Sequence, residues 1–94
     1  MGIYNDNFIS IGVITMSKAD KMFEKLGYVK FHEPDDTAIE YTRYSTIEAT
    51  RRICFWEDRK NFSCWSNLSI SMPITMPELQ AINEKVKELG WLDE

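Results

Sequence analysis

The sequence has little cysteine, histidine, glycine and proline, and no long apolar run. Two cysteines and one histidine among 94 residues are too few for a disulfide scaffold, and they give at most three soft metal ligands at no typical zinc spacing. The four glycines are isolated, which excludes a glycine-rich phosphate loop, and three prolines do not make a fibrous or disordered composition. The apolar stretch Phe8–Met16 is nine residues long, too short to span a bilayer, and no basic residue precedes it as in a signal peptide. We therefore expect a folded cytoplasmic domain with reduced thiols, no metal, no cofactor and no membrane partner.

The chain is acidic overall, with 15 acidic and 11 basic residues and a net charge of −4. Domains that bind nucleic acid mainly through its phosphates usually carry a basic excess, so the net charge argues against that mode of binding. The basic residues are unevenly spread, because five of them lie between Arg43 and Lys60 among only three acidic residues. The middle of the chain is thus its basic part, and the acidic excess lies elsewhere.

Two segments carry the signals of a helix with a defined start and a defined stop. Thr75 precedes Glu78 by three residues, the spacing of a capping box, and an apolar stripe with a period of three or four follows until Gly90. In both segments an aromatic residue comes directly after the glycine and can pack back on the last helical turn. The first helix repeats the pattern with its own capping pair and its own glycine stop: Ser17, Asp20 and Gly27.

Between the two helices the apolar period changes to two, which is typical of strands. Residues 29–32 and 39–42 alternate in this way around the turn signal at residues 34–36, and Arg51–Glu57 forms a third alternating segment. In Phe62–Ile74 the even positions other than Ser66 are apolar, which fits one strand or two strands broken near residues 66 and 67. The sequence therefore predicts an α+β fold: a helix, an antiparallel meander of three or four strands, and a C-terminal helix.

We expect residues 16–94 to form one α+β domain with both helices on one face of the sheet. Residues 1–15 have two interpretations that the sequence leaves open. They are a leading strand, because Ile14-Thr15-Met16 resembles Ile74-Thr75-Met76, or a non-native leader that precedes a start at Met16. The expected core consists of the apolar residues that share the inner faces: Met22, Phe23, Leu26, Val29, Phe31, Ile39, Ile53, Phe55, Leu68, Ile70, Leu79, Ile82, Val86 and Leu89.

No residue pattern indicates catalysis. A catalytic interpretation of His32 would make it the base for Cys54 or Cys64. No nucleophile motif surrounds either cysteine, and the acidic residues show no spacing that singles out a pair. A surface histidine and buried free cysteines account for these residues. We therefore expect a protein without enzymatic activity.

The middle of the predicted sheet interleaves aromatic and basic residues, and this region is the candidate binding surface. Trp, Tyr and Arg are the residues enriched at protein interface hot spots, so our first hypothesis is a surface that binds a protein. Aromatic rings flanked by arginines also bind single-stranded nucleic acid by stacking on its bases, which is the alternative. The alternation places Trp56 on the face opposite Ile53 and Phe55. The candidate residues are Tyr41, Arg43, Tyr44, Arg52, Trp56, Arg59 and Trp65.

The C-terminal segment Ile74–Trp91 contains Leu-Gln-Ala-Ile in its helix and ends in Glu-Leu-Gly-Trp. It resembles short uncharacterised proteins carried by phages and prophages of low-GC Gram-positive bacteria, and Phe23–Tyr28 resembles a segment near their start. The resemblance implies a small accessory protein that starts near Met16 and acts in the host cytoplasm. Its partner would be a host or phage protein, or a second copy of the chain. Both motifs are helix-end features, so they assign no functional residue.

Overall fold

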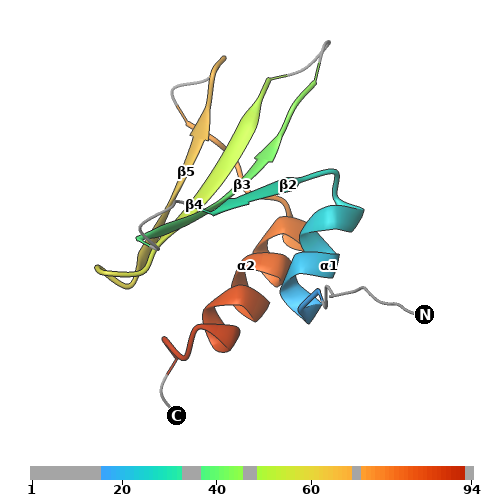
Figure 1. Ribbon diagram of the computed structural model, residues 1–94. Helices are drawn as coiled ribbons and strands as arrows, with labels where there is room; N and C mark the ends of the chain where they lie inside the picture. The colour runs from blue at the N-terminus through green and yellow to red at the C-terminus, as the bar shows by residue number, and fades with distance from the viewer. Residues whose placement is uncertain (1–15, 33–36, 46–48, 69–70, 93–94) are drawn as a thin grey trace, which may run out of the picture.

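The computed structural model describes residues 16–32, 37–45, 49–68 and 71–92 of the chain. Its elements are α1 (Lys18–Lys25), β2 (Val29–His32), β3 (Ala38–Arg43), β4 (Arg51–Trp56), β5 (Asn61–Ser66) and α2 (Met76–Glu88) (Figure 1). The predicted α+β fold is confirmed, and the meander has four strands. Both interpretations of residues 1–15, and the predicted core residue Ile70, lie outside the described residues.

The helices begin and end where the sequence predicts. The Thr75 hydroxyl accepts from the Glu78 N–H at 3.2 Å, and the Glu78 carboxylate accepts from the Thr75 N–H at 3.0 Å, which completes the capping box at the start of α2. At the other end Gly90 has φ = 74°, and the Trp91 N–H donates to the carbonyl of Val86 at 3.1 Å. These are the contacts of a Schellman stop, and α1 ends in the same way at Gly27.

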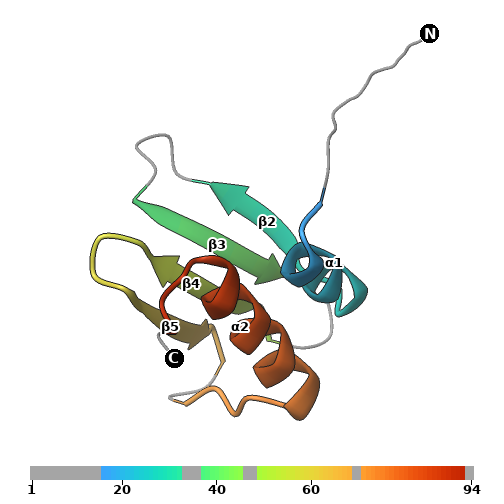
Figure 2. The same ribbon diagram turned by 90° about the horizontal axis from the view of Figure 1, so that it is seen from below.

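The four strands lie in the order β2-β3-β4-β5, and every neighbouring pair is antiparallel. The register places one row of residues straight across the sheet: Phe31, Glu40, Cys54 and Ser63. Both helices pack on the same face of this sheet and against each other (Figure 2). Among the described residues of the segment Phe62–Ile74, only those up to Ser66 belong to a strand.

The core lies between the helices and the sheet and is built around stacked aromatic rings. The rings of Phe23 and Tyr41 stack 4.0 Å apart with an interplanar angle of 14°, and both meet Phe55 edge-on. Apolar residues of α2 close this cluster, which consists of Phe23, Tyr28, Ile39, Tyr41, Ile53, Phe55, Ala81 and Ile82. The predicted core residues Met22, Leu26, Val86 and Leu89 pack against its margin.

Four predicted core residues are exposed, and two of them share one cause. Val29 and Phe31 are 51% and 45% exposed because β2 turns its other side, Lys30 and His32, toward the helix face. Strand β2 pairs Val29 with Thr42 and Phe31 with Glu40, so both apolar side chains lie on the face away from the helices. The prediction that they belong to the core is wrong.

The third and fourth exceptions are Leu68 and Leu79. Leu68 follows β5 in a bend and is exposed, so the strand-like alternation that placed it inside does not extend to it. Helix α2 buries the stripe Glu78, Ala81, Ile82 and Lys85, which is rotated by about one residue from the predicted apolar stripe and leaves Leu79 exposed. The rotation is tolerated because both buried charges have partners, Arg51 for Glu78 and Asp20 for Lys85.

Candidate functional site

The face of the sheet that points away from both helices is the candidate functional site, and we call it the open face. Side chains alternate between the two faces of a strand, so the register assigns every strand position to one of them. The open face consists of Val29 and Phe31 of β2, Ala38, Glu40 and Thr42 of β3, Arg52, Cys54 and Trp56 of β4, and Asn61, Ser63 and Trp65 of β5. No helix of the described part of the chain covers it (Figures 1 and 2).

Large apolar side chains are exposed on two sides of this face. Val29 and Phe31 form one group on β2, and Trp56 and Trp65 form another on β4 and β5, where they are 36% and 47% exposed. The smaller residues between them are buried by their taller neighbours, since Ala38, Thr42 and Cys54 have almost no accessible surface. The face is therefore uneven in exposure, with accessible apolar side chains on two sides and buried small residues between them.

A salt bridge lies in the centre of the open face. Arg52 Nε is 3.0 Å from Glu40 Oε2, and the Thr42 hydroxyl donates to the same oxygen at 2.6 Å. The Arg52 guanidinium also lies over the Trp65 ring, 4.8 Å from its centroid. No hydrogen bond of Arg52 Nε is aligned among the described residues, so its contact with Glu40 is one of charge. Arg52 is thus held flat on the face by an acid on one side and an indole on the other.

A hollow of about 260 Å³ lies on the open face between the two tryptophans, and we call it the tryptophan hollow. Cys54 and Ser63 belong to the row between those of Trp56 and Trp65, so the two rings stand at opposite ends of the hollow. The Trp56 Nε1–H donates to the Ser63 hydroxyl at 3.2 Å, which fixes that indole over its neighbouring strand. The residues that line the tryptophan hollow are Ala38, Glu40, Arg52, Cys54, Trp56, Ser63 and Trp65.

Five of the seven candidate residues lie on the open face or at its margin. Arg52, Trp56 and Trp65 stand on it, Tyr44 is exposed directly after β3, and the Arg59 guanidinium lies 5.9 Å from the Trp56 ring centroid. Val29 and Phe31 also lie on the open face, but the sequence placed them in the core instead of among the candidate residues. An apolar residue on an alternating strand is assigned to the core by default, and no local signal in β2 indicates otherwise.

Tyr41 and Arg43, the other two candidate residues, do not lie on the open face. Tyr41 is 1% exposed and forms part of the aromatic core, because β3 directs it toward α1. Arg43 lies on the same helix side of β3, with its guanidinium 5.8 Å from the centroid of the Tyr28 ring. A signal in the sequence could have excluded both, because Tyr41 and Arg43 alternate with Glu40 and Thr42 and so share a face with Ile39, an expected core residue.

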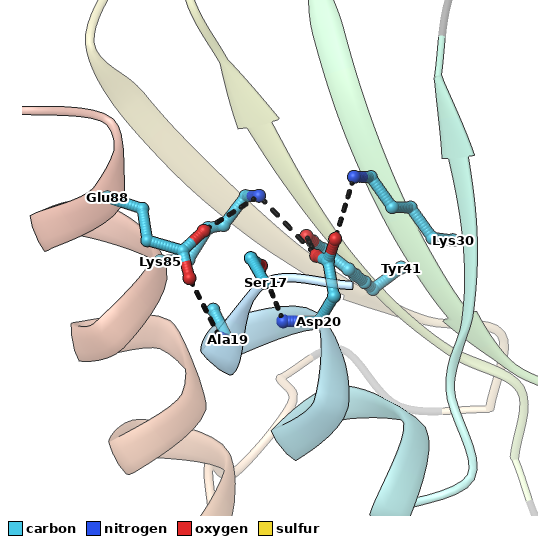
Figure 3. A network of polar contacts seen from close by, with 7 residues as sticks. All are labelled: Ser17, Ala19, Asp20, Lys30, Tyr41, Lys85 and Glu88. Carbon is cyan, nitrogen blue, oxygen red and sulfur yellow. Dashed lines mark hydrogen bonds and ion pairs between the residues drawn. The ribbon is translucent and has the colours of Figure 1, made fainter. Parts of the chain in front are cut away.

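The helix side of the sheet holds a polar network centred on Asp20 (Figure 3). The Tyr41 hydroxyl donates to Asp20 Oδ1 at 2.5 Å, Lys30 Nζ lies 2.9 Å from Oδ2, and Lys85 Nζ lies 3.4 Å from Oδ1. Burial alone would raise the pKa of Asp20, but the hydrogen bonds from Tyr41 and Lys30 and the charge of Lys85 outweigh it and hold that pKa below its usual range. Burial and the bond to Asp20 raise the pKa of Tyr41. Every polar group named here is partnered.

A second network joins α2 to β4. The Arg51 guanidinium binds both carboxylate oxygens of Glu78, at 2.9 Å and 2.7 Å, and the Tyr28 hydroxyl donates to Glu78 at 2.5 Å. Burial raises the pKa of Tyr28, the bond to Glu78 adds to it, and that pKa reaches about 12. Burial opposes ionisation of Glu78 too, yet the bonds from Arg51 and Tyr28 lower its pKa. The two networks tie the helices to the sheet.

The hollow beside α1 and β2, of about 590 Å³, is larger than the tryptophan hollow, and Asp20, Lys30 and Tyr41 line it. The Asp20 carboxylate on this hollow is already bound by that lysine and that hydroxyl, and the exposed Glu24 carboxylate also lines it.

The cysteines and the histidine are also separated. The register puts Cys54 on the open face and Cys64 on the helix face, and His32 lies at the end of β2. Burial raises the pKa of the Cys64 thiol. Among the described residues no group of three or more His, Cys, Asp and Glu side chains is placed to hold a metal ion.

No helix within the described ranges is long and apolar enough to cross a membrane. Comparison with protein-family models, with curated proteins and with solved structures gives no match. The geometry of the open face is therefore the basis for inferring a function.

Proposed function

We propose that this protein is a non-enzymatic binding module that holds a partner protein on the open face of its sheet. The observation that carries the proposal is the exposure of Val29, Phe31, Trp56 and Trp65 on one face. An exposed apolar patch of this kind on a folded domain marks an interaction site more often than a random surface feature.

The chemistry of the open face suits a protein partner. Tryptophan and arginine are the side chains that contribute most to protein interfaces, and here Arg52 is ordered by its contacts with Glu40 and Trp65. A side chain that is held in place before binding loses less conformational entropy when the partner arrives. The face also offers both charges, so it can meet the mixed polar rim of another protein.

Single-stranded nucleic acid is the second candidate, because two arginines lie over the two exposed tryptophans. Arg52 stacks on Trp65 and Arg59 approaches Trp56, an arrangement that could hold bases on the rings and phosphates beside them. Glu40 in the centre of the face and the net charge of −4 oppose this binding mode.

The proposal is tested by quantitative capture with three forms of the immobilised full-length chain. They are the wild type, Trp65→Ala on the open face, and Phe62→Ala as a control of similar exposure on the opposite face of β5. We expect at least one protein from an extract of the source cell that the wild type and the control retain equally and that Trp65→Ala retains about tenfold less. Identical retention by all three forms would overturn the proposal.

A parallel titration distinguishes single-stranded nucleic acid from a protein as the partner. Short single-stranded oligonucleotides are added at low and at high salt while tryptophan fluorescence is recorded. Salt-sensitive quenching that Trp65→Ala removes would favour nucleic acid over protein as the partner. The proposal expects no such quenching.

A further inference from the structure

We propose that the partner on the open face is a second copy of this chain, joined face to face so that Phe31 of each subunit enters the tryptophan hollow of the other. The inference rests on the proposed function, because it names the occupant of the same surface. It is carried by two features of one face: a protruding aromatic side chain, and a hollow lined by aromatic rings.

Phe31 and the tryptophan hollow lie at the same height along the strands. The register aligns Phe31 with Glu40, Cys54 and Ser63, and the last three belong to the lining of the hollow. The phenyl ring is 45% exposed on β2, at one margin of the sheet, while the hollow lies over β4 and β5 at the other. The protruding group and the receiving site are therefore displaced only sideways, across the strands.

A two-fold axis that runs parallel to the strands, in the plane between two facing sheets, exchanges these two margins. Rotation about such an axis reverses the order of the strands but keeps the height of each residue along them. It places β2 of one subunit over the β4–β5 side of the other, with Phe31 opposite the Cys54–Ser63 row. A two-fold dimer requires a surface that complements itself, and the contact of Phe31 with the hollow then forms twice, once in each direction.

The charges of the open face complement themselves under the same rotation. The axis brings the β4 of one subunit over the β3 of the other, so Arg52 lies one row away from Glu40 of the second copy. Arg52 is 40% exposed in the single chain and Glu40 is 23% exposed, and the partner sheet would shield both from water. One acid and one base per subunit leave the interface neutral, so like charges do not oppose the dimer.

The area of the open face determines how tightly we expect the dimer to form. Three strands of six residues and one of four, with usual spacings, give a flat area of about 350 Å², below the roughly 800 Å² per partner of a standard stable interface. We therefore expect a reversible dimer with a dissociation constant on the order of micromolar rather than a permanent one.

The test is sedimentation equilibrium of the full-length chain over a wide range of concentrations. We compare the wild type with Phe31→Asp and with the matched control Phe62→Asp, which changes a phenylalanine of similar exposure on the helix face. Dimerisation of the wild type and the control, with a dissociation constant at least about tenfold higher for Phe31→Asp, supports the inference. Dimerisation that is equally strong in all three forms overturns it.

A mixing experiment tests the exchange of Phe31 specifically. Ser63→Trp fills the tryptophan hollow but leaves Phe31 intact, whereas Phe31→Asp does the reverse. A mixture of the two variants can form one complete Phe31 contact, so we expect a heterodimer that is tighter than either variant homodimer. A heterodimer no tighter than the two homodimers contradicts the proposed geometry.

The outcomes separate this inference from the proposed function. A wild-type chain that stays monomeric up to about 1 mM overturns the self-association. If that monomer still captures another protein through Trp65, the open face remains a protein-binding surface with a different occupant. If it captures none, both proposals fail.

Discussion

At the scale of single residues, two acidic side chains join the helices to the sheet. Asp20 of α1 binds Tyr41, Lys30 and Lys85, and Glu78 of α2 binds a guanidinium and a phenol. A buried carboxylate is tolerated because its partners compensate for the lost hydration. Alternation along the strand places Tyr41 on the same face as Ile39, but the partner of its hydroxyl lies 21 positions away in the chain, where no local signal identifies it.

Removing the Tyr41 hydroxyl should destabilise the fold without touching the open face. In Tyr41→Phe the ring remains stacked on Phe23, but the 2.5 Å bond to Asp20 is lost. We expect the free energy of unfolding to fall by about 1–2 kcal/mol, measured by urea denaturation. Tyr44→Phe is the matched control because Tyr44 is exposed, and we expect a change within about 0.5 kcal/mol. Equal losses in the two variants would contradict the structural role of Tyr41.

The lowered pKa values of Asp20 and Glu78 predict a loss of stability in acid. Their folded pKa values lie below those of the unfolded chain, so the unfolded state takes up protons first as the pH falls. The contribution of both groups should be complete above the unfolded value of about 4 and should disappear as the pH falls through the lower folded values.

Urea denaturation across a pH series checks this profile. Glu78→Gln should be less stable than the wild type at neutral pH and should lose less stability on acidification. Glu24→Gln, which replaces an exposed carboxylate of α1, should follow the wild-type profile. An unchanged acid limb in Glu78→Gln would show that Glu78 does not contribute to it.

At the scale of elements, the ends of the helices could be predicted from the sequence, but their orientation could not. Capping residues and glycine stops act within a few positions, so the sequence alone reveals them. The rotation of α2 depends on Arg51 and Asp20, which lie far away in the chain and neutralise Glu78 and Lys85. The face of β2 depends likewise on its pairing with β3, which the strand's own alternation does not determine.

The glycine that ends α2 allows a test of backbone conformation alone. Gly90 has φ = 74°, and an added Cβ would meet no atom within 4 Å. Gly90→Ala should therefore cost about 1 kcal/mol from the left-handed conformation only, measured by thermal unfolding. Gly90→Asn should lose less, because asparagine adopts this conformation more readily. Equal stability of Gly90→Ala and the wild type would contradict the conformation at this helix end.

At the scale of the whole molecule, the two-layer arrangement explains why large apolar side chains are exposed on the open face. Both helices pack on one face of the sheet, so apolar residues of the other face have no cover within the described part of the chain (Figure 2). The sequence indicated Arg52 and Trp56 of this face through the regular alternation along β4, and Trp65 of β5 as an aromatic residue near the arginines. It did not indicate Phe31, so the β2 side of the open face could not be predicted.

The central claim is that the open face, and not the helical layer, meets the partner. Hydroxyl-radical footprinting tests it directly by comparing the dilute purified chain with the chain in a concentrated extract of its source cells, treated with nuclease to remove nucleic acid. Phe31, Trp56 and Trp65 should be modified readily in the dilute chain and protected in the extract, while the exposed Met76 of α2 should be modified equally in both. Equal modification of the open face in both samples, or protection confined to Met76, would contradict the account.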